Sequence, residues 1–515
     1  MTAGCYRLEM TSALLLALVL SDAAPPDASD RPPNIVFVIA DDLGYGDLGC
    51  FGSTKIRTPN IDRIAERGAR LTTHYAGSPV CAPSRCVLMT GLHPGHAEVR
   101  NNREMQPEGQ WPLSADAVTL AERFGGHGYA TGCFGKWGLG GPGTVGEPLA
   151  QGIDRFYGFN CQRIAHNYYP VSLWSDRDVV PLRNPAFSAY QTLPSDADAN
   201  DPASYDRYRG PDYSADLIAE QAVAFIADHA DEPFLLLHTS AIPHVALQAP
   251  DEAIGPAAER IADDPPYDGS GGYLPVHRPR ATYAGMVERL DAHVGQLLDA
   301  LDAAGIAHQT IVVFTSDNGP ATPGFAGVDS DWFASRGRVD GQTLRGYKGS
   351  MHEGGIRVPC VVSGPMIAAG TTIDRRTGFE DWTPTLLELA GGADWSTGLQ
   401  TAGSTGQTVD VDGVSFAPTL RGTPQSSRPP LYREFAGYGG QQAIWDGDWK
   451  AIRRGLSRRG TPADPPWQLF DLADDPGEQS DVAGEHPAVV ERLDRLAGAM
   501  RDPAPLFPLR AIDGE

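Results

Sequence analysis

The chain has 515 residues, and its fractions of hydrophobic (41%) and charged (21%) residues are those of ordinary globular proteins. Such a length allows a large buried core and more than one domain. The formal net charge of −24 argues against nucleic acid as a partner, and it means that only a local cationic pocket could capture an anionic substrate.

The first 24 residues have the features of a secretory signal peptide. Arg7 precedes an apolar run from Ala13 to Leu20, and small residues follow that run. The run is too short to span a membrane, and no later stretch is long and apolar enough to do so. We therefore expect residues 1–24 to be a signal peptide, residues 25–33 to be a flexible linker, and the mature protein to be secreted or periplasmic.

The first predicted strand runs from Asn34 to Ala40. Its continuous apolar, β-branched character is typical of a strand buried on both faces of a parallel sheet. Asp41 and Asp42 follow directly, where open α/β sheets bind ligands. Because successive strand residues face opposite ways, the chain must turn at Asp41 for both carboxylates to converge, and Gly44 and Gly46 permit a turn. A solvated turn is the alternative, since Asp is common in turns.

A helix and a short strand are expected next. Thr58 suits the N-cap of the helix, Pro59 its first turn, and Gly68 the position just past its end. A strand from Ala69 to His74 then leads to a cysteine-containing stretch.

The stretch that begins at Cys81 predicts a short helix. Pro83 suits a first helical turn, and Gly91 suits the residue after a helix end. Cys81 would then lie at the helix N-terminus, where the dipole favours negative charge, and Arg85 would point back toward it from one turn on. Such a cysteine could be a nucleophile with a low pKa, or it could be an inert, half-buried thiol.

The middle of the chain alternates helices and strands. We expect helices at 118–124, 214–228 and 283–301, and strands at 129–134, 234–238 and 311–316. The strand at 311–316 delivers Asp317 and Asn318 at its carboxyl end, as the first strand delivers its two aspartates. These four oxygen ligands suit Ca²⁺ or Mg²⁺ rather than zinc, and we favour Ca²⁺ because it tolerates irregular geometry.

Lysine is rare in this chain. Lys136 and Lys348 lie in glycine-rich, turn-like contexts, and only Lys55 and Lys450 accompany them. In so arginine-biased a sequence, a retained lysine indicates a need for a compact point charge, although four residues are too few for statistics.

The C-terminal part predicts a smaller unit. A strand at 356–362 precedes a Gly-, Thr- and Ser-rich stretch, after which come a hairpin at 445–449, a strand at 467–470 and a helix at 487–500. The alternation of elements predicts an α/β fold with a doubly wound, mostly parallel central sheet flanked by helices over residues 34–400. Residues 401–515 are expected to form a small antiparallel sheet with a helix.

The seven cysteines show neither metal-ligand spacing nor a disulfide framework. Cys5 would leave with the signal peptide, and Cys81 belongs to the motif above. One bridge remains open among the others, which are Cys50, Cys86, Cys133, Cys161 and Cys360.

The residues Cys-Ala-Pro-Ser-Arg at 81–85 resemble the signature of type I sulfatases, in which this cysteine is oxidised enzymatically to formylglycine. The likeness extends from about Asn34 to Asp481. It implies an alkaline-phosphatase-like fold and the hydrolysis of a sulfuric ester, either of a sulfated sugar or of an aryl sulfate. It also implies two partners, namely that sulfated substrate and a formylglycine-generating maturation enzyme.

The resemblance assigns roles to particular residues. The formylglycine hydrate at Cys81 would attack sulfur, Arg85 would hold this residue, and His244 would lie near the bridging oxygen. Lys136 and Lys348 would hold the sulfate oxygens. The implied calcium ligands are Asp41, Asp42, Cys81, Asp317 and Asn318.

One position departs from the family pattern. Members commonly have histidine two residues after the first lysine, in Gly-Lys-Trp-His, where this chain has Gly138. That histidine contacts the formylglycine hydroxyl, so His166 or His352 could substitute for it, although a histidine in such a position is more often structural. Gly138 together with residues 165–169 is similar to bacterial proteins resembling N-acetylgalactosamine-6-sulfatases, which makes a sulfated galactose-type sugar the leading substrate hypothesis.

Two other functions are weighed against the hydrolase. A phosphoesterase of the same superfamily would use serine or threonine as its nucleophile, and Cys81 in the modification motif argues against it. A non-catalytic, secreted glycan-binding protein would explain the missing histidine at Gly138. The oxygen ligands and the two lysines argue against that reading, since a binding protein needs no modified thiol.

Overall fold

A ten-stranded sheet with the order β13-β2-β12-β9-β1-β8-β4-β5-β6-β7 organises residues 33–515. The neighbouring strands β9, β1, β8, β4 and β5 are mutually parallel. Their bounds are Thr310–Ser316, Asn34–Ala40, Phe234–Thr239, Ala130–Lys136 and Arg155–Phe159. Their carboxyl ends therefore lie along one edge of the sheet, which is where such sheets bind ligands.

The computed structural model describes residues 1–2, 31–262, 265–392, 395, 411–458 and 465–514. The predicted signal peptide and linker lie almost wholly outside the described residues. The predicted boundary between residues 400 and 401 also lies outside them, so the domain limits stay a prediction.

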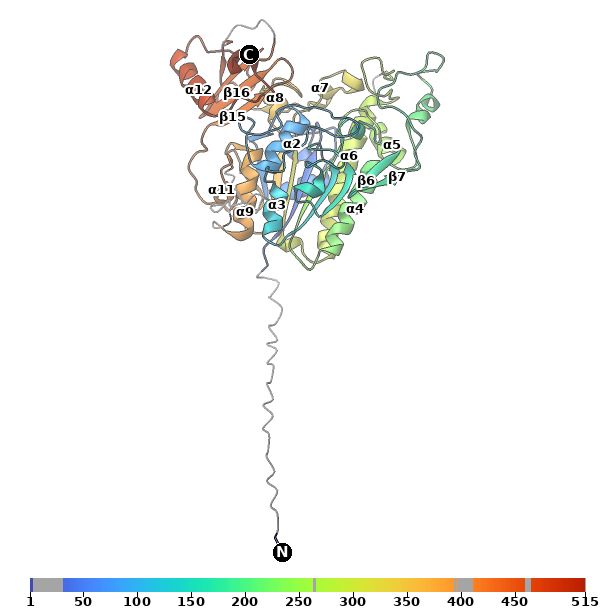
Figure 1. Ribbon diagram of the computed structural model, residues 1–515. Coiled ribbons are helices and arrows are strands. Elements are labelled where there is room, and N and C mark those ends of the chain that lie inside the picture. The colour runs from blue at the N-terminus through green and yellow to red at the C-terminus, as the bar shows by residue number, and fades with distance from the viewer. Residues whose placement is uncertain (3–30, 263–264, 393–394, 396–410, 459–464, 515) are drawn as a thin grey trace. The chain divides into compact units, whose positions relative to one another are not determined.

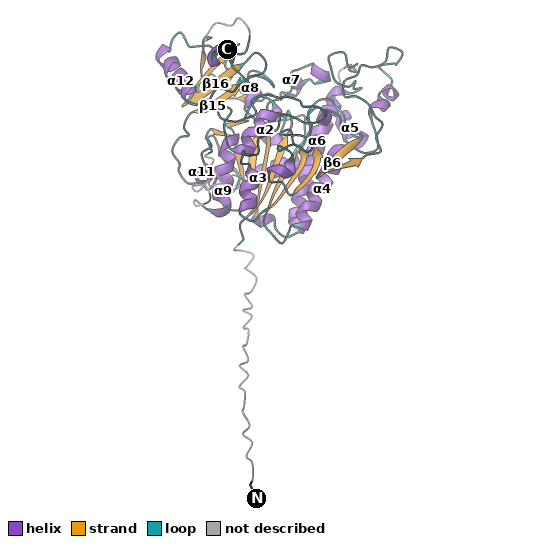
Figure 2. Ribbon diagram, in the orientation of Figure 1, coloured by secondary structure: helices purple, strands orange, loops and turns teal. Residues whose placement is uncertain are grey.

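Both faces of the central sheet are covered by helices. Along β1, Ile35 and Phe37 pack into one hydrophobic cluster, while Val36 and Val38 pack into a second one on the other face. The first cluster includes α2 (Cys81–Thr90), α3 (Leu120–Gly126) and α9 (Trp382–Gly391). The second includes α1 (Pro59–Arg67), α4 (Ser214–Asp228), α5 (Asp251–Ala258) and α6 (Pro279–Ala303). Figures 1 and 2 show the sheet between these layers, so the predicted doubly wound α/β fold is confirmed.

The edges of the sheet are mixed. Strand β12 runs antiparallel to β9 and β2, and β6 runs antiparallel to β5 and β7. The bounds of these outer strands are β12 Cys360–Ser363, β2 Ala69–Leu71, β13 Thr371–Ile373, β6 Ser172–Ser175 and β7 Asp178–Pro181.

A separate four-stranded antiparallel sheet lies toward the C-terminus. Its strands are β15 (Leu431–Phe435), β16 (Gln441–Asp446), β17 (Trp449–Arg454) and β18 (Gln468–Asp471). Helix α12 (Pro487–Ala499) packs on it through Leu493, which joins Tyr432 and Ile444 in one cluster. The predicted small antiparallel sheet with a terminal helix is therefore confirmed.

Two predicted strands have other limits in the structure. The strand expected at 69–74 is divided into β2 and β3 (His74–Tyr75), because β3 leaves the large sheet to pair with β14 (Thr377–Gly378). The strand expected to begin at Ile356 begins at Cys360, because Ile356 ends the short helix α8 (Glu353–Ile356). The remaining short elements are α7 (Ser330–Phe333), β10 (Arg338–Val339), β11 (Gln342–Thr343), α11 (Ala417–Leu420) and α13 (Arg510–Asp513).

The described cysteines, Cys50 to Cys360, are all free thiols. Within the described part of the chain, no helix is both long and apolar enough to cross a membrane.

Candidate active site

Four oxygen-bearing side chains meet at the carboxyl ends of two adjacent strands. Asp41 and Asp42 follow β1, Asp317 and Asn318 follow β9, and all four are buried. The Asn318 side-chain amide donates to Asp42 Oδ1 over 2.8 Å, and the Asp42 backbone N–H donates to Asp317 Oδ1 over 3.3 Å. The turn was expected at Asp41, but the residue in the left-handed conformation is Asp42, which has a φ of +65°. The four side chains therefore lie close together at one edge of the sheet, and their role as metal ligands stays a prediction.

Cys81 is the first residue of α2, and the helix ends at Gly91 with a φ of 72°. The Cys81 thiol donates to Asp41 Oδ1 over 3.2 Å. Burial raises the pKa of this thiol, and the charge of Asp41 raises it further. Cys81 is therefore a neutral thiol at physiological pH, which argues against the alternative of a nucleophile with a low pKa.

Arg85 lies one turn further along α2, and its guanidinium bonds other residues rather than Cys81. Its Nε and Nη2 donate to Asp317 Oδ2 over 3.1 and 3.0 Å, and its Nη1 donates to the Lys136 carbonyl over 2.5 Å. Arg85 thus joins α2 to the ends of β9 and β4.

Two lysines flank the thiol, and Lys136 is buried while Lys348 is half-buried. Lys136 ends β4, and its ammonium group donates to Asp41 Oδ2. Lys348 comes from the loop before α8, with Nζ 2.7 Å from Asp42 Oδ1 and 3.5 Å from Cys81 Sγ. Burial opposes the charge of Lys348, yet Asp42 and the other acidic groups raise its pKa well above the usual value. Both lysines are therefore charged beside Cys81.

His244 lies in the loop after β8. Its Nδ1 bonds the Val245 carbonyl, which leaves Nε2 facing Asp42 Oδ2 at 3.5 Å. Burial lowers the pKa of His244 well below the usual value, and the Lys348 charge lowers it further. The ligand atoms of Asp41, Asp42, Cys81 and His244 all lie within 4.8 Å of one another.

His166 and His352, the two candidates to replace the histidine missing at Gly138, lie in different parts of the structure. His166 stacks on His244 with ring centroids 4.1 Å apart and an interplanar angle of 9°. His352 instead lies 3.2 Å from Glu478 Oε2, next to the small sheet. The structure therefore brings His166 to the site and leaves His352 outside it.

Gln162 is a residue that the sequence did not single out. A Cβ at Gly138 would lie 2.6 Å from the Gln162 side-chain nitrogen, so Gln162 fills the space that a larger residue at Gly138 would need. That Nε2 is buried and has no hydrogen-bond partner among the described residues. Nothing in the local sequence indicates this contact, because it joins two different loops.

Aromatic side chains border His244, and sequence reasoning missed these too. The His166 Nδ1 lies 2.6 Å from the Tyr190 hydroxyl. Tyr273 lies near His244, Tyr190 and Phe325, with ring centroids 6.1, 5.1 and 5.4 Å away. Tyr190 and Phe325 are 43% and 44% exposed, so part of this aromatic group faces solvent.

Known proteins resemble this chain over most of its length. A family model described as Sulfatase matches residues 33–393. Human arylsulfatase A is 33% identical over 516 residues, which cover 94% of this chain and 89% of that protein. The N-acetylgalactosamine-6-O-sulfatase of Bacteroides thetaiotaomicron is 28% identical, over 92% of this chain and 94% of that protein. The crystal structure of Ps i-CgsB in complex with k-i-k-neocarrahexaose has a TM-score of 0.70 at 25% identity, over 92% of this chain and 94% of that chain.

The family match spans the strands β1 and β9, helix α2 and the loop of Lys348. It therefore includes every side chain that meets around Cys81. The chain belongs to the sulfatase family, and it is a sulfatase with the fold of the alkaline-phosphatase-like superfamily.

Proposed function

We propose that this sulfatase removes sulfate from a sulfated sugar or an aryl sulfate at the site around Cys81. The observation that carries the proposal is the burial of this thiol between Asp41 and Lys348, with Lys136 bonded to the same aspartate. Oxidation of Cys81 to formylglycine by a maturation enzyme would supply the oxygen nucleophile, which the neutral thiol does not provide.

The oxygen-bearing residues fit a hard cation. Asn318 Oδ1 is buried and has no hydrogen-bond partner in the described part of the chain, as expected of an oxygen that binds an ion. Ca²⁺ suits this oxygen set better than Mg²⁺, because Mg²⁺ demands near-octahedral geometry and keeps its waters. When bound, the ion would stabilise negative charge on oxygen. The residues proposed to hold it are Asp41, Asp42, Asp317, Asn318 and the modified Cys81.

The two lysines are proposed to bind the sulfate group. An ammonium group has three N–H donors, and Lys136 uses one of them on Asp41. The remaining donors of Lys136 and Lys348 can reach oxygens of a sulfate ester placed over Cys81, where they would neutralise charge that develops on the sulfuryl oxygens. Arg85 acts on the same site by holding Asp317 in place.

His244 is proposed to protonate the leaving oxygen. Its Nδ1–H, assigned from the bond to the Val245 carbonyl, leaves Nε2 free to carry a second proton. An anionic sulfate ester beside the ring would favour the protonated form, and so would offset the burial that lowers its pKa. His244 can then act as the general acid at Nε2.

The aromatic group beside His244 supports a cyclic leaving group. Tyr273, Tyr190 and Phe325 present rings on which the face of a sugar or aryl ring could pack. The relative from Bacteroides thetaiotaomicron is named N-acetylgalactosamine-6-O-sulfatase, so a sulfated galactose-type sugar is the first substrate to test.

The test combines mass spectrometry with desulfation assays on natively produced protein. We expect the peptide that contains Cys81 to carry formylglycine, and sulfate release from at least one member of a panel of sulfated sugars and aryl sulfates. Cys81→Ser should abolish that release. Unmodified thiol together with no sulfate release would favour the glycan-binding alternative, and retained activity in Cys81→Ser would refute the proposed nucleophile.

A further inference from the structure

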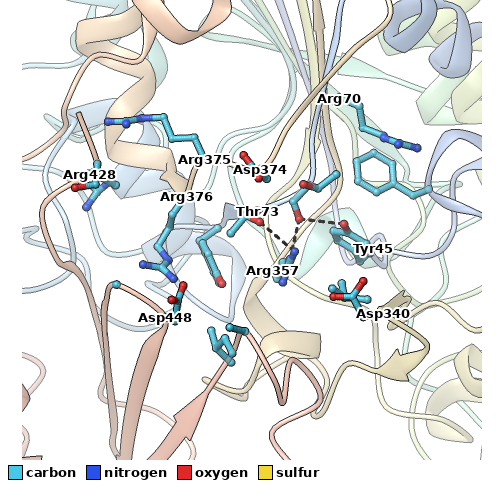
Figure 3. A pocket seen from close by; sticks show the side chains of 18 of the residues that line it. Tyr45, Arg70, Thr73, Asp340, Arg357, Asp374, Arg375, Arg376, Arg428 and Asp448 are labelled. Atoms are coloured by element: carbon cyan, nitrogen blue, oxygen red, sulfur yellow. Dashed lines mark hydrogen bonds between the residues drawn. The ribbon is translucent and has the colours of Figure 1, made fainter. Parts of the chain in front are cut away.

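A cavity of about 1270 Å³ lies apart from the residues around Cys81. Its walls come from the end of β2 and from residues 338–340, 374–376, 425–428 and 446–448, so the large and the small sheet both contribute (Figure 3). No candidate active-site residue is among the described residues that line it. The cavity is larger than a typical small-molecule pocket, so it has room for an extended ligand.

Six arginines line this cavity, hereafter the arginine pocket, although the chain as a whole carries a net charge of −24. Arg357 pairs with Glu353, and Arg428 pairs with Glu380. The other four have no carboxylate oxygen within 4.0 Å among the described residues. These four are Arg70, Arg338, Arg375 and Arg376.

Arg375 and Arg376 are half-buried, and each has a buried donor atom without a partner. The Nε atom of each is buried and has no hydrogen-bond partner among the residues that the structure describes. Arg375 donates from Nη1 to the Ser426 carbonyl, and burial lowers its pKa. A buried N–H donor without an acceptor costs free energy, which a bound oxyanion would recover.

Carboxylates also line the arginine pocket, but among the described residues none of them lies within 4.0 Å of these four guanidinium groups. Asp340, Asp374 and Asp448 are exposed to solvent, and Asp446 is paired with Arg492 outside the pocket. Figure 3 shows Arg375 and Arg376 on one side of the pocket and Arg70 on the other, so cationic side chains line the cavity on two sides.

The arginine pocket also has aromatic residues in its wall, of which Phe51 is half-buried and Tyr45 is buried. Phe51 and Tyr45 line it, and the Arg70 guanidinium lies 5.8 Å from the centre of the Phe51 ring. Tyr45 follows the metal-ligand candidate Asp42 by three residues, so the pocket shares a loop with the candidate active site. A planar guanidinium group can donate two parallel hydrogen bonds to two oxygens of one sulfate group, and aromatic rings pack against the faces of sugars.

We propose that the arginine pocket is a second binding site for a sulfated oligosaccharide, at which Arg375 and Arg376 bind sulfate oxygens. This inference rests on the proposed function, because it takes its ligand from the class of substrate proposed for the active site. It extends that function, since a site remote from Cys81 would select polymeric over small substrates.

The test compares wild-type protein with R375Q/R376Q. Calorimetry with a chondroitin 6-sulfate hexasaccharide should show that the double variant binds about tenfold or more weakly. Its kcat/KM on a small aryl sulfate should stay at the wild-type value. R207Q/R495Q removes the same charge from two exposed positions outside the pocket and should bind normally. Should the double variant fail to fold, R338Q, at an exposed position, should weaken binding in the same direction.

Several outcomes would overturn the inference. Wild-type affinity in R375Q/R376Q, or an equal loss in R207Q/R495Q, would do so. Equal binding of an unsulfated chondroitin hexasaccharide, or competition by inorganic sulfate or a DNA oligonucleotide at the same concentration, would show that the pocket does not select a sulfated glycan. If the wild-type protein binds the hexasaccharide but releases no sulfate, and R375Q/R376Q loses this binding, the pocket would be supported and the proposed hydrolysis refuted.

Discussion

Gly138 lies two residues after Lys136 with a φ of +84°, in the left-handed region that favours glycine. The family pattern has histidine at this position. Here the conformation disfavours any side chain, and Gln162 already fills the adjoining space. The Gln162 side chain places a buried amide nitrogen without a hydrogen-bond partner among the described residues next to Gly138. The shape of the site at this position therefore differs from the common family pattern, as the residue type does.

Gly138→Ala should lower the free energy of unfolding by about 1–3 kcal/mol, since a side chain at this φ is strained and its Cβ would meet Gln162. Urea denaturation measures this loss. Gly143→Ala is the matched control, because Gly143 has a φ of +74° with no atom within 4 Å of the added Cβ. Equal destabilisation by the two substitutions would show that the contact with Gln162 contributes nothing.

At the scale of the elements, an ionic cluster joins α8 to the small sheet. Glu353 on α8 accepts from Lys450 on β17 over 2.8 Å and from the Tyr75 hydroxyl over 2.8 Å. Lys450 also lies 2.8 Å from Glu478, which accepts from the Glu353 backbone N–H over 2.7 Å. Because Lys348 comes five residues before Glu353, this cluster helps to place the loop that reaches Cys81.

The cluster predicts an acid-sensitive contribution to stability. Burial alone would raise the pKa of Glu353, but Lys450 and Arg357 outweigh burial and lower it from 4.5 to about 2. A carboxyl with a lowered folded-state pKa stabilises the protein above its unfolded pKa, and this contribution is lost as pH falls from about 4.5 to 2. The linked contribution is about 3 kcal/mol.

Urea unfolding of wild-type and Glu353→Gln protein between pH 7 and pH 3 measures this pH-dependent contribution to the free energy of unfolding. We expect the stability difference between the two proteins to shrink as the pH falls. Glu491→Gln is the control, because Glu491 is exposed and, among the described residues, pairs with Arg495 alone at the surface of α12. A difference that stays constant across this pH range would contradict the assignment.

For the whole molecule, charge is distributed unevenly. The net charge of −24 repels anions at long range, while Lys136, Lys348 and the arginine pocket attract them locally. Capture of a polyanionic substrate is therefore a balance between a long-range barrier and short-range attraction. Salt weakens the long-range repulsion more than the short-range attraction, because it screens interactions between exposed charges that lie more than a Debye length apart.

We expect kcat/KM on chondroitin 6-sulfate chains to rise as ionic strength increases from about 0.01 to 0.1 M, where the Debye length falls to about 10 Å. A small, singly charged aryl sulfate should respond less, because it meets less repulsion. Steady-state assays with both substrates in the same buffers measure the contrast. A monotonic fall on the polymeric substrate would contradict the prediction.

Local pattern alone determined much of this protein. The apolar, β-branched run from Asn34 to Ala40 can be stable only inside a sheet, and the acids that follow such a strand must lie at its carboxyl end. Pro83 likewise lies in the first turn of helix α2, and Gly91 follows its last residue, as their backbone preferences predict. Each of these inferences depends on residues close together in the chain, whose backbone preferences do not require knowledge of the fold.

The tertiary structure decided which distant residues meet. His166 and His352 look alike in sequence, yet one stacks on His244 and the other lies beside Glu478. Gln162 beneath Gly138 and the arginine pocket also join segments remote in sequence. Strand order and loop paths bring such residues together, and both follow from packing of the whole core, which no local pattern encodes.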